Sequence, residues 1–492
     1  MAITVPTAEP PPTAAPTLPP VLPSGAVPTP DRPRFASGAV TEGAAEHSVA
    51  SGENLSAIAL RYGTTVQTLV DLNALTNPDI LSVGQVIRLP DAPDALTSDL
   101  KLLPDSLLVR GSLSRGFDVK AFVAAQPGYI RNASDTVNSR SADGSSSDEI
   151  LASGDVIERV SREYGVDARV LLAALEYRAR WLSQSEIDEA LLTHPLIGRE
   201  ASPVNRSGLY RQLSWFANEV NRGYYGWKYE GWDVIELSDG TRMRYAPGLN
   251  AATVGLQHVL RLNNTPDVWQ RDIGLEGFVS VYRRYFGEPF EAVPDVYAAT
   301  IPDQPALTLP FRQGETWFFT GGAHGGWGSG SAWSSIDFAP PDERTDRLCY
   351  TSAFPVTAAA DGIIARSGEG AVVLDLDGDG DELTGWTVFY LHLANRVAEG
   401  TRVRAGDVVG YASCEGGVST ATHLHIGRRY NGEWIPATCF ACPDGINIPP
   451  FTLAGWTVVA LRGQEYQGYL QNGGERRVAE QGRQTPINRV SW

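Results

Sequence analysis

The segment Thr422-His423-Leu424-His425-Ile426 decides how the C-terminal third of this chain is interpreted. Side chains alternate between the two faces of a β-strand, so the two histidines point the same way while Leu424 and Ile426 point into a core. Two imidazoles on one strand face are typical of a site that binds a transition metal. The segment therefore predicts a β-sheet domain that presents metal ligands.

Two further histidines lie upstream in short segments of the same third of the chain. They end Gly-Gly-Ala-His324 and Phe-Tyr-Leu-His392, and the segment Trp-Ser-Ser-Ile-Asp337 adds a carboxylate. Imidazole and carboxylate are usual zinc ligands, and a catalytic zinc site keeps one of four positions open for water. Two histidines and one aspartate are enough to hold one zinc ion, which leaves two histidines for acid-base chemistry.

These segments resemble the zinc endopeptidases of the lysostaphin and LytM type, which cut peptide cross-links in bacterial cell walls. The resemblance implies that His324, Asp337 and His425 bind zinc. It also implies that His392 and His423 activate water and stabilise the transition state. Twelve residues separate His324 from Asp337, whereas most members place the Asp four residues after the His. The longer spacing is similar to the β-lytic metalloendopeptidase branch, and the match covers residues 308–450.

Tyr390 precedes His392 by two residues, so a strand would place both side chains on one face. Its hydroxyl could then bond a developing oxyanion, and packing in the core is the alternative role. All five positions of the family pattern are filled, which predicts an active enzyme. Two other interpretations are a wall-binding protein without catalysis and a glycan-cleaving enzyme that uses the middle of the chain.

The four cysteines also lie in the C-terminal third. An even count in an exported protein predicts disulfides, with three possible pairings. We favour Cys349–Cys414 and Cys439–Cys442. The alternative makes Cys439-Phe-Ala-Cys442 half of a zinc knuckle or a redox motif, but the sequence has no second pair at matching spacing to complete four zinc ligands.

The acidic run from Asp375 to Glu382 resembles the start of a calcium loop. The twelfth position is Trp386 rather than Glu, which excludes an EF-hand. An acidic hairpin turn is the favoured interpretation, with a bound calcium ion as the alternative.

Residues 47–91 have the pattern β-α-α-β in a short span. This pattern resembles a LysM domain, which binds the N-acetylglucosamine chains of peptidoglycan or chitin. A small domain without a ligand is the alternative. The resemblance implies a sugar groove on two loops, formed by Gly52, Glu53, Asn54, Asn77, Pro78, Asp79, Ile80 and Leu81.

Residues 98–292 have a mainly helical pattern, and residues 160–177 resemble the opening of a lysozyme-like transglycosylase domain. That family has Glu-Ser where this chain has Arg178-Ala179, and Glu176 lies two residues early on another helix face. Glycan cleavage requires a correctly placed carboxylic acid. We therefore expect a lysozyme-like domain that has lost catalysis and binds glycan. Its aromatic stretch at 215–232 either stacks on sugars or packs in the core.

The remaining segments complete a multidomain fold class. Residues 1–46, rich in Pro, Ala and Thr, predict a disordered tether, and residues 451–492 an extension of the peptidase domain. We expect a small β-α-α-β LysM domain, a mainly α-helical lysozyme-like domain, and a C-terminal antiparallel all-β peptidase domain.

Composition limits the possible partners. A net charge of −17 makes nucleic acid and anionic membranes poor partners. No apolar run approaches the ~20 residues that a membrane span requires. No export signal is visible, yet the resemblance implies a protein that is secreted or associated with the cell envelope. We expect a monomer that binds bacterial peptidoglycan through its peptide cross-links and its N-acetylglucosamine glycan.

Overall fold

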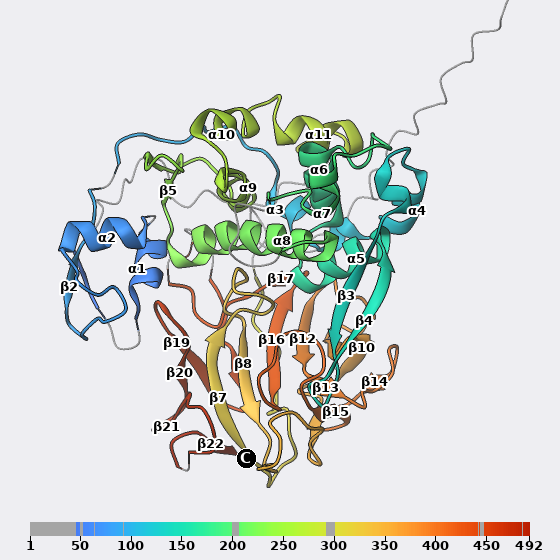
Figure 1. Ribbon diagram of the computed structural model, residues 1–492. Coiled ribbons are helices and arrows are strands. Elements are labelled where there is room, and N and C mark those ends of the chain that lie inside the picture. Colours follow the sequence, from blue (N-terminus) through green and yellow to red (C-terminus); the bar gives the residue numbers. More distant parts are fainter. Residues whose placement is uncertain are drawn as a thin grey trace, which may run out of the picture.

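The computed structural model describes residues 46–49, 53–62, 64–91, 93–198, 206–291, 301–440, 442, 447–484 and 486–492. The expected tether lies outside these ranges apart from Glu46, and so does Gly52. A helical region lies above a β-sheet region, with a small N-terminal unit at its side (Figure 1). Within the described ranges, none of the helices combines the length and apolar character needed to cross a membrane.

The N-terminal unit has the expected order β-α-α-β. Its strands β1 (Glu46–Ser48) and β2 (Val86–Arg88) pair antiparallel, and between them lie helices α1 (Leu55–Arg61) and α2 (Val66–Asn73). The hydroxyl of Thr65 caps α2 by accepting from the Thr68 amide at 3.0 Å. A separate apolar core closes the unit.

The middle region is helical, as the periodicity predicts. Its apolar stripe on α5 is buried, and Gly165 ends that helix with a φ of 69°. The helices are α3 (Asp105–Leu108), α4 (Val119–Ala125), α5 (Ser153–Tyr164), α6 (Ala168–Ala179), α7 (Glu189–Thr193), α8 (Leu209–Tyr225), α9 (Ala251–Arg261), α10 (Pro266–Asp272) and α11 (Phe278–Phe286).

Two β-hairpins interrupt these helices, and the sequence did not predict them. They are β3 (Ser134–Arg140) with β4 (Ser146–Ala152), and β5 (Val234–Glu236) with β6 (Arg242–Arg244). Strand β4 is mostly exposed on both faces. It therefore lacks the apolar alternation by which a half-buried strand is recognised.

The C-terminal region is antiparallel β, as expected. Its main sheet has the order β14-β10-β11-β12-β16-β8-β7-β22, with β17 paired to β16. The strands are β7 (Thr316–His324), β8 (Ser335–Ala339), β10 (Gly362–Gly368), β11 (Ala371–Asp375), β12 (Trp386–Leu391), β14 (Arg402–Val403), β16 (Leu424–Tyr430), β17 (Glu433–Trp434) and β22 (Arg489–Ser491).

Two smaller sheets flank this main sheet. One has the order β13-β15-β9, from β13 (Leu393–Ala394), β15 (Val408–Ala412) and β9 (Pro355–Thr357). The chain after residue 450 forms the other, with β18 (Thr452–Leu453), β19 (Trp456–Leu461), β20 (Gln464–Asn472) and β21 (Glu475–Val478). It then returns β22 to the edge of the main sheet beside β7.

The two faces of the main sheet are buried against different partners. Leu424 and Ile426 belong to the core of the β region, as the sequence predicts. The opposite face carries Phe389, Leu391 and Trp434, which share one continuous core with the helices of the middle region. The helical region therefore packs directly on one face of this sheet (Figure 1).

Candidate metal centre

Three neighbouring strands bring together the three residues expected to bind zinc. His324 ends β7, Asp337 lies in β8 and His425 lies in β16. Strand β8 runs between the other two, and the strand register places Asp337 directly opposite His425. Asp337 Oδ1 lies 3.3 Å from His324 Nε2 and 3.2 Å from His425 Nδ1.

The remaining ring nitrogens of these histidines face backbone carbonyls. His324 Nδ1 lies 2.7 Å from the Gly322 oxygen, and His425 Nε2 lies 3.1 Å from the Gly326 oxygen. A carbonyl accepts hydrogen bonds only, so each of these two nitrogens carries a proton. His324 Nε2 and His425 Nδ1 lie 2.9 Å apart. Burial lowers the pKa of His324, but Asp337 raises it above its usual value, and in the neutral rings that bind a metal both facing nitrogens present lone pairs.

The carboxylate completes a donor set that fits a cation. Asp337 Oδ1 is buried, and no donor in the described part of the chain makes a hydrogen bond to it. Burial pushes the pKa of Asp337 upward, but His324 and His423 nevertheless hold it well below its usual value. Two imidazole lone pairs and one carboxylate oxygen converge, and a divalent ion with nitrogen and oxygen ligands satisfies all three.

Glycine permits the close approach of β7 to this carboxylate. A Cβ atom on Gly321 would lie 2.4 Å from Asp337 Oδ2. Any larger residue at position 321 would displace the Asp337 side chain from its place between the two histidines.

His392 and His423 lie beside these ligands, and their rings face each other with centroids 4.6 Å apart. His423 Nε2 lies 3.7 Å from Asp337 Oδ1, and its Nδ1 faces the Ala421 carbonyl at 2.8 Å. His392 Nδ1 faces the Glu415 carbonyl at 3.1 Å. Burial and the neighbouring histidines lower the pKa of His392 well below its usual value, so its ring is neutral.

The expectation for Tyr390 is wrong. Strand β12 ends at Leu391, and His392 turns out of it with a φ of 64°, so the two side chains do not share a face. Tyr390 pairs with Ile426, on the face opposite to His425. Its hydroxyl accepts a hydrogen bond from the Ala359 amide at 2.8 Å in the core of the β region. Tyr390 therefore has the packing role.

The C-terminal extension contributes two residues that the sequence did not indicate. The ring of Tyr466 stacks on His324 with centroids 4.2 Å apart, and the residue has a φ of 67°. Glu465 accepts a hydrogen bond from the Gly325 amide at 3.2 Å, just after His324. Strand β20 therefore forms one side of the metal centre, although no spacing rule links it to the histidines.

The middle region covers the same sheet face that carries the ligands. Leu391 lies opposite His425 in the register, and Phe389 follows on the same face. Both belong to the core that the helices complete. Beyond His324, the Gly330 amide donates to the Asn218 side chain of α8 at 2.9 Å. The metal centre keeps contact with solvent beside these covered residues, because the His423 side chain is 20% exposed and Tyr466 is 51% exposed.

Glu176 in the middle region has a structural role. Its carboxylate is buried, and Oε2 accepts from the Leu182 and Ser183 amides at 2.9 and 3.1 Å. Oε1 accepts from the Tyr285 hydroxyl at 3.2 Å. A carboxylate that organises a loop in this way is not placed to protonate a glycosidic oxygen.

Most of the aromatic stretch at 215–232 packs in the core rather than facing a ligand. Tyr224, Tyr225, Trp227 and Tyr229 are each at most 3% exposed. The interpretation of these four rings as a sugar platform is therefore wrong. Trp232, at the end of the stretch, is half-buried.

Both favoured disulfides are confirmed: Cys349 pairs with Cys414, and Cys439 pairs with Cys442. The acidic run forms a turn between β11 and β12, where the Asp375 carboxylate accepts from the Asp377 and Gly380 amides. Carboxylates of Asp375, Asp377 and Asp379 approach one another. That proximity is explained by the turn and gives calcium no further support.

The expected sugar loops of the N-terminal unit are mainly exposed, with one exception. In the second loop Ile80 is 68% exposed, Asn77, Pro78 and Asp79 are exposed, and Leu81 is partly buried. In the first loop Asn54 is exposed. Glu53 instead pairs with His47 at 2.7 Å, and its side chain is 2% exposed. Its role is therefore to hold the loop to β1.

Comparison with known families matches three parts of the chain. Three family models match: the LysM domain at residues 47–90, the LasA N-terminal domain at residues 101–299, and peptidase family M23 at residues 336–436. The chain therefore carries a LysM domain, a LasA N-terminal domain and an M23 peptidase domain. The M23 match includes Asp337, His392, His423 and His425, and His324 precedes it.

The chain is also homologous to a characterised protease. It is 26% identical to Protease LasA of Pseudomonas aeruginosa (strain UCBPP-PA14) over 351 residues, which cover 68% of this chain and 74% of that protein. Over 86 residues it is 37% identical to N-acetylmuramoyl-L-alanine amidase XlyB of Bacillus subtilis (strain 168), covering 17% of this chain and 27% of that protein.

Similar solved structures include two peptidases. The M23 metalloprotease Pseudoalterin from the deep sea is 24% identical, with a TM-score of 0.28, covering 35% of this chain and 95% of that one. The catalytic domain of lysostaphin from Staphylococcus simulans is 26% identical, with a TM-score of 0.18, covering 24% of this chain and 81% of that one.

Proposed function

We propose that this protein is a zinc-dependent endopeptidase that hydrolyses the cross-bridge or stem peptides of bacterial peptidoglycan. The observation that carries this proposal is the convergence of His324 Nε2, Asp337 Oδ1 and His425 Nδ1 around one point. The M23 match over the same strands supports it.

In the proposed reaction, a zinc ion held by these three residues would polarise the peptide carbonyl and lower the pKa of a water molecule. His392 is neutral, and its Nε2 is unprotonated because Nδ1 faces the Glu415 carbonyl. It is therefore suited to take the proton from water and deliver it to the leaving amine. His423 Nε2 faces the same centre and would orient the water.

The other regions would deliver the enzyme to its substrate. The LysM domain would bind N-acetylglucosamine-containing glycan through Asn54 and the exposed loop at 77–81. The middle domain would act without catalysis, since the Glu176 carboxylate is engaged on both oxygens. An enzyme that acts on the cell wall must be secreted or associated with the cell envelope. We propose that this protein acts there as a monomer.

Mass spectrometry of products from isolated peptidoglycan tests this proposal. The intact chain is incubated with zinc, before and after limited proteolysis, because the middle domain covers the sheet face that bears the site. New amino termini in stem or bridge peptides support the endopeptidase and identify the bond. New reducing sugar ends would move catalysis to the middle domain. Intact wall that only retains the protein, with zinc bound stoichiometrically, would indicate a binding protein.

A further inference from the structure

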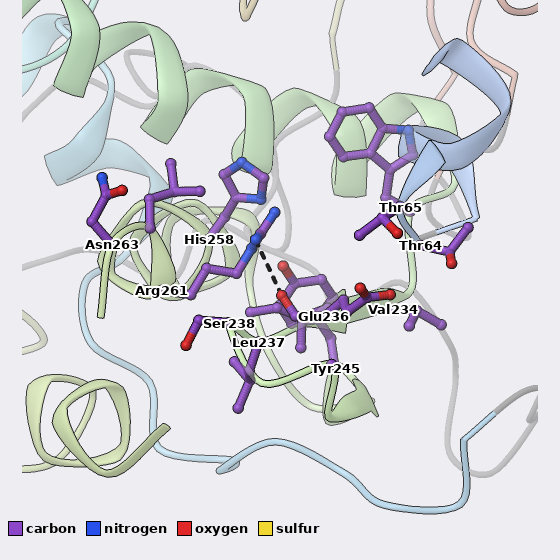
Figure 2. Close-up of a pocket in the computed structure, with 14 residues that line it drawn as sticks. Thr64, Thr65, Val234, Glu236, Leu237, Ser238, Tyr245, His258, Arg261 and Asn263 are labelled. Carbon is purple, nitrogen blue, oxygen red and sulfur yellow. Dashed lines mark hydrogen bonds between the residues drawn. The ribbon is translucent and has the colours of Figure 1, made fainter. Parts of the chain in front are cut away.

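A cavity of about 340 Å³ lies at the junction of the LysM and middle domains. Thr64 and Thr65, in the turn between α1 and α2, form one wall. The β5–β6 hairpin and the end of α9 form the others, and Figure 2 shows the threonines beside Val234 and Glu236 of the hairpin. The cavity shares no residue with the exposed LysM loop at 77–81. Ligand sites occur preferentially at such domain junctions.

Hydrogen bonds hold the two domains in a fixed relative position at this junction. Arg242 of β6 donates to the Asp91 and Tyr62 carbonyls at 2.9 and 3.3 Å. The connecting segment bonds to β6 as well, because the Thr97 amide donates to the Arg244 carbonyl at 2.8 Å. The cavity walls from the two domains are therefore connected by hydrogen bonds.

Several polar atoms around the cavity are buried without a hydrogen bond. They are Thr64 Oγ1, Glu236 Oε2 and Arg261 Nε, as judged within the described ranges. Glu236 Oε2 lies 3.9 Å from Arg242 Nε, and Thr64 and Arg261 also act on the Glu236 carboxylate. Burial of unsatisfied polar atoms costs stability, and a ligand with hydroxyl and amide groups would satisfy them.

The charges around the cavity balance. Glu236 and Arg261 lie side by side, and the Arg261 guanidinium donates to the Glu236 carbonyl at 3.1 Å (Figure 2). Burial and the nearby Arg261 lower the pKa of His258 to about 4, so its ring is neutral. The lining therefore favours a neutral ligand over an anion or a cation.

The rest of the lining suits a sugar ring. Trp232 and Tyr245 supply aromatic surface, which packs against the apolar face of a pyranose. Ser238 donates its proton to the Asn264 carbonyl at 2.7 Å, which leaves its oxygen available as an acceptor. Asn263 adds an amide at the rim.

We propose that this cavity is a second saccharide-binding subsite, formed jointly by the LysM and middle domains, for a neutral N-acetylated sugar of the wall glycan. The choice of glycan rests on the proposed function. The subsite gives the middle domain a binding role and would fix the glycan relative to the peptidase domain.

Photo-crosslinking of the intact chain tests the subsite. The probe is an N-acetylglucosamine tetramer that carries a diazirine, and labelled peptides are mapped by mass spectrometry. We expect label at residues 232–245 or 258–263, in addition to the loop at 77–81. Label confined to 77–81 would overturn the proposal.

Matched variants assign that label to the cavity. Thr64→Val and Glu236→Gln remove one polar function each, from different domains, and should each lower cavity labelling about tenfold. Ile80→Asp should lower only the loop label, and the exposed Glu276→Gln should change neither. Because the two cavity variants lie in different domains, a folding defect in one leaves the other as a test. Unchanged cavity label in both would overturn the proposal.

A parallel measurement separates this proposal from the proposed function. His425→Ala should keep both labels while losing cleavage. Labelling at the cavity with no cleavage by the zinc-loaded wild-type chain would contradict the endopeptidase and leave the subsite intact.

Discussion

Two buried carboxylates in this chain, Asp337 and Glu176, have opposite environments. Asp337 Oδ1 receives no hydrogen bond from the described residues and faces two imidazole nitrogens at 3.2 and 3.3 Å. Glu176 accepts two amide hydrogen bonds and one from a phenol. Both carboxylates are buried, so burial alone does not identify the one that can bind a metal or react. The difference is whether the carboxylate oxygens already accept hydrogen bonds.

The largest expected effect on zinc binding and cleavage comes from removing the His425 imidazole, which faces Asp337. His425→Ala should abolish stoichiometric zinc binding and lower peptide cleavage about a thousandfold or more. Plasma emission spectrometry gives the zinc content, and amino-terminal labelling gives the rate. His423→Ala is the matched control and should retain zinc while losing cleavage. An empty site in that control would contradict the division of roles between the two histidines.

Changing Glu176 should affect stability and spare chemistry. Glu176→Gln replaces one carboxylate oxygen with an NH₂ group, which cannot accept a hydrogen bond from the surrounding donors. The change should lower the free energy of unfolding by about 1–3 kcal/mol. Tyr285→Phe removes only one of the three hydrogen bonds and should cost less. Urea denaturation measures both, and zinc content should not change. If Glu176→Gln no longer solubilised the wall while His425→Ala still did, Glu176 would be the reactive carboxylate and Asp337 would not.

A smaller effect should come from the ring stacked on His324. Tyr466→Ala should weaken zinc binding about threefold to tenfold, because stacked aromatic pairs contribute modestly. Tyr466→Phe keeps the ring and should match the wild type. Competition with a chromogenic chelator measures the affinity. Equal weakening in both variants would indicate that the hydroxyl, rather than the stack, supports the site.

A further effect, on the pH dependence of stability, concerns a third carboxylate. Burial, reinforced by Asp377, raises the pKa of Asp375 to about 7. The folded state therefore favours the protonated acid, and this contribution to stability is lost as pH rises from 3.8 through about 7. Asp375→Asn mimics the neutral form and should flatten the stability profile in that window. Denaturant midpoints of the wild type and of Asp375→Asn across this pH range test it. If stability depended on pH equally in both, another group would be responsible for the dependence.

The sequence predicted which three residues converge in the candidate metal centre, a helical middle region and an antiparallel β C-terminal region. The alternation at 422–426 placed two histidines on one face, and the spacing of the family pattern supplied His324 and Asp337. Tyr390 was misassigned because alternation holds only within a strand, and the backbone leaves β12 before His392. Tyr466 lies in a distant hairpin with no periodic relation to the histidines, so only tertiary packing reveals it.

The middle region was predicted in part. Its helices follow from apolar stripes, whereas the exposed hairpin β3–β4 has no alternating pattern to detect. The aromatic residues at 224–229 pack in the core or bind sugar according to whether their side of the helix faces the protein interior or the solvent. The sequence could not show that face, because the peptidase sheet contributes to the same core.

That common core limits how the parts of this protein can be inherited. Phe389, Leu391 and Trp434 are buried among helices of the middle region, and Lys228 of that region reaches Glu433 at 2.9 Å. A gene fusion that supplied the peptidase region alone would expose this apolar face and leave a buried charge unpaired. The LysM unit has its own core. Exchanging it would leave the core shared by the other two regions intact, although it would remove the cavity wall formed by Thr64 and Thr65.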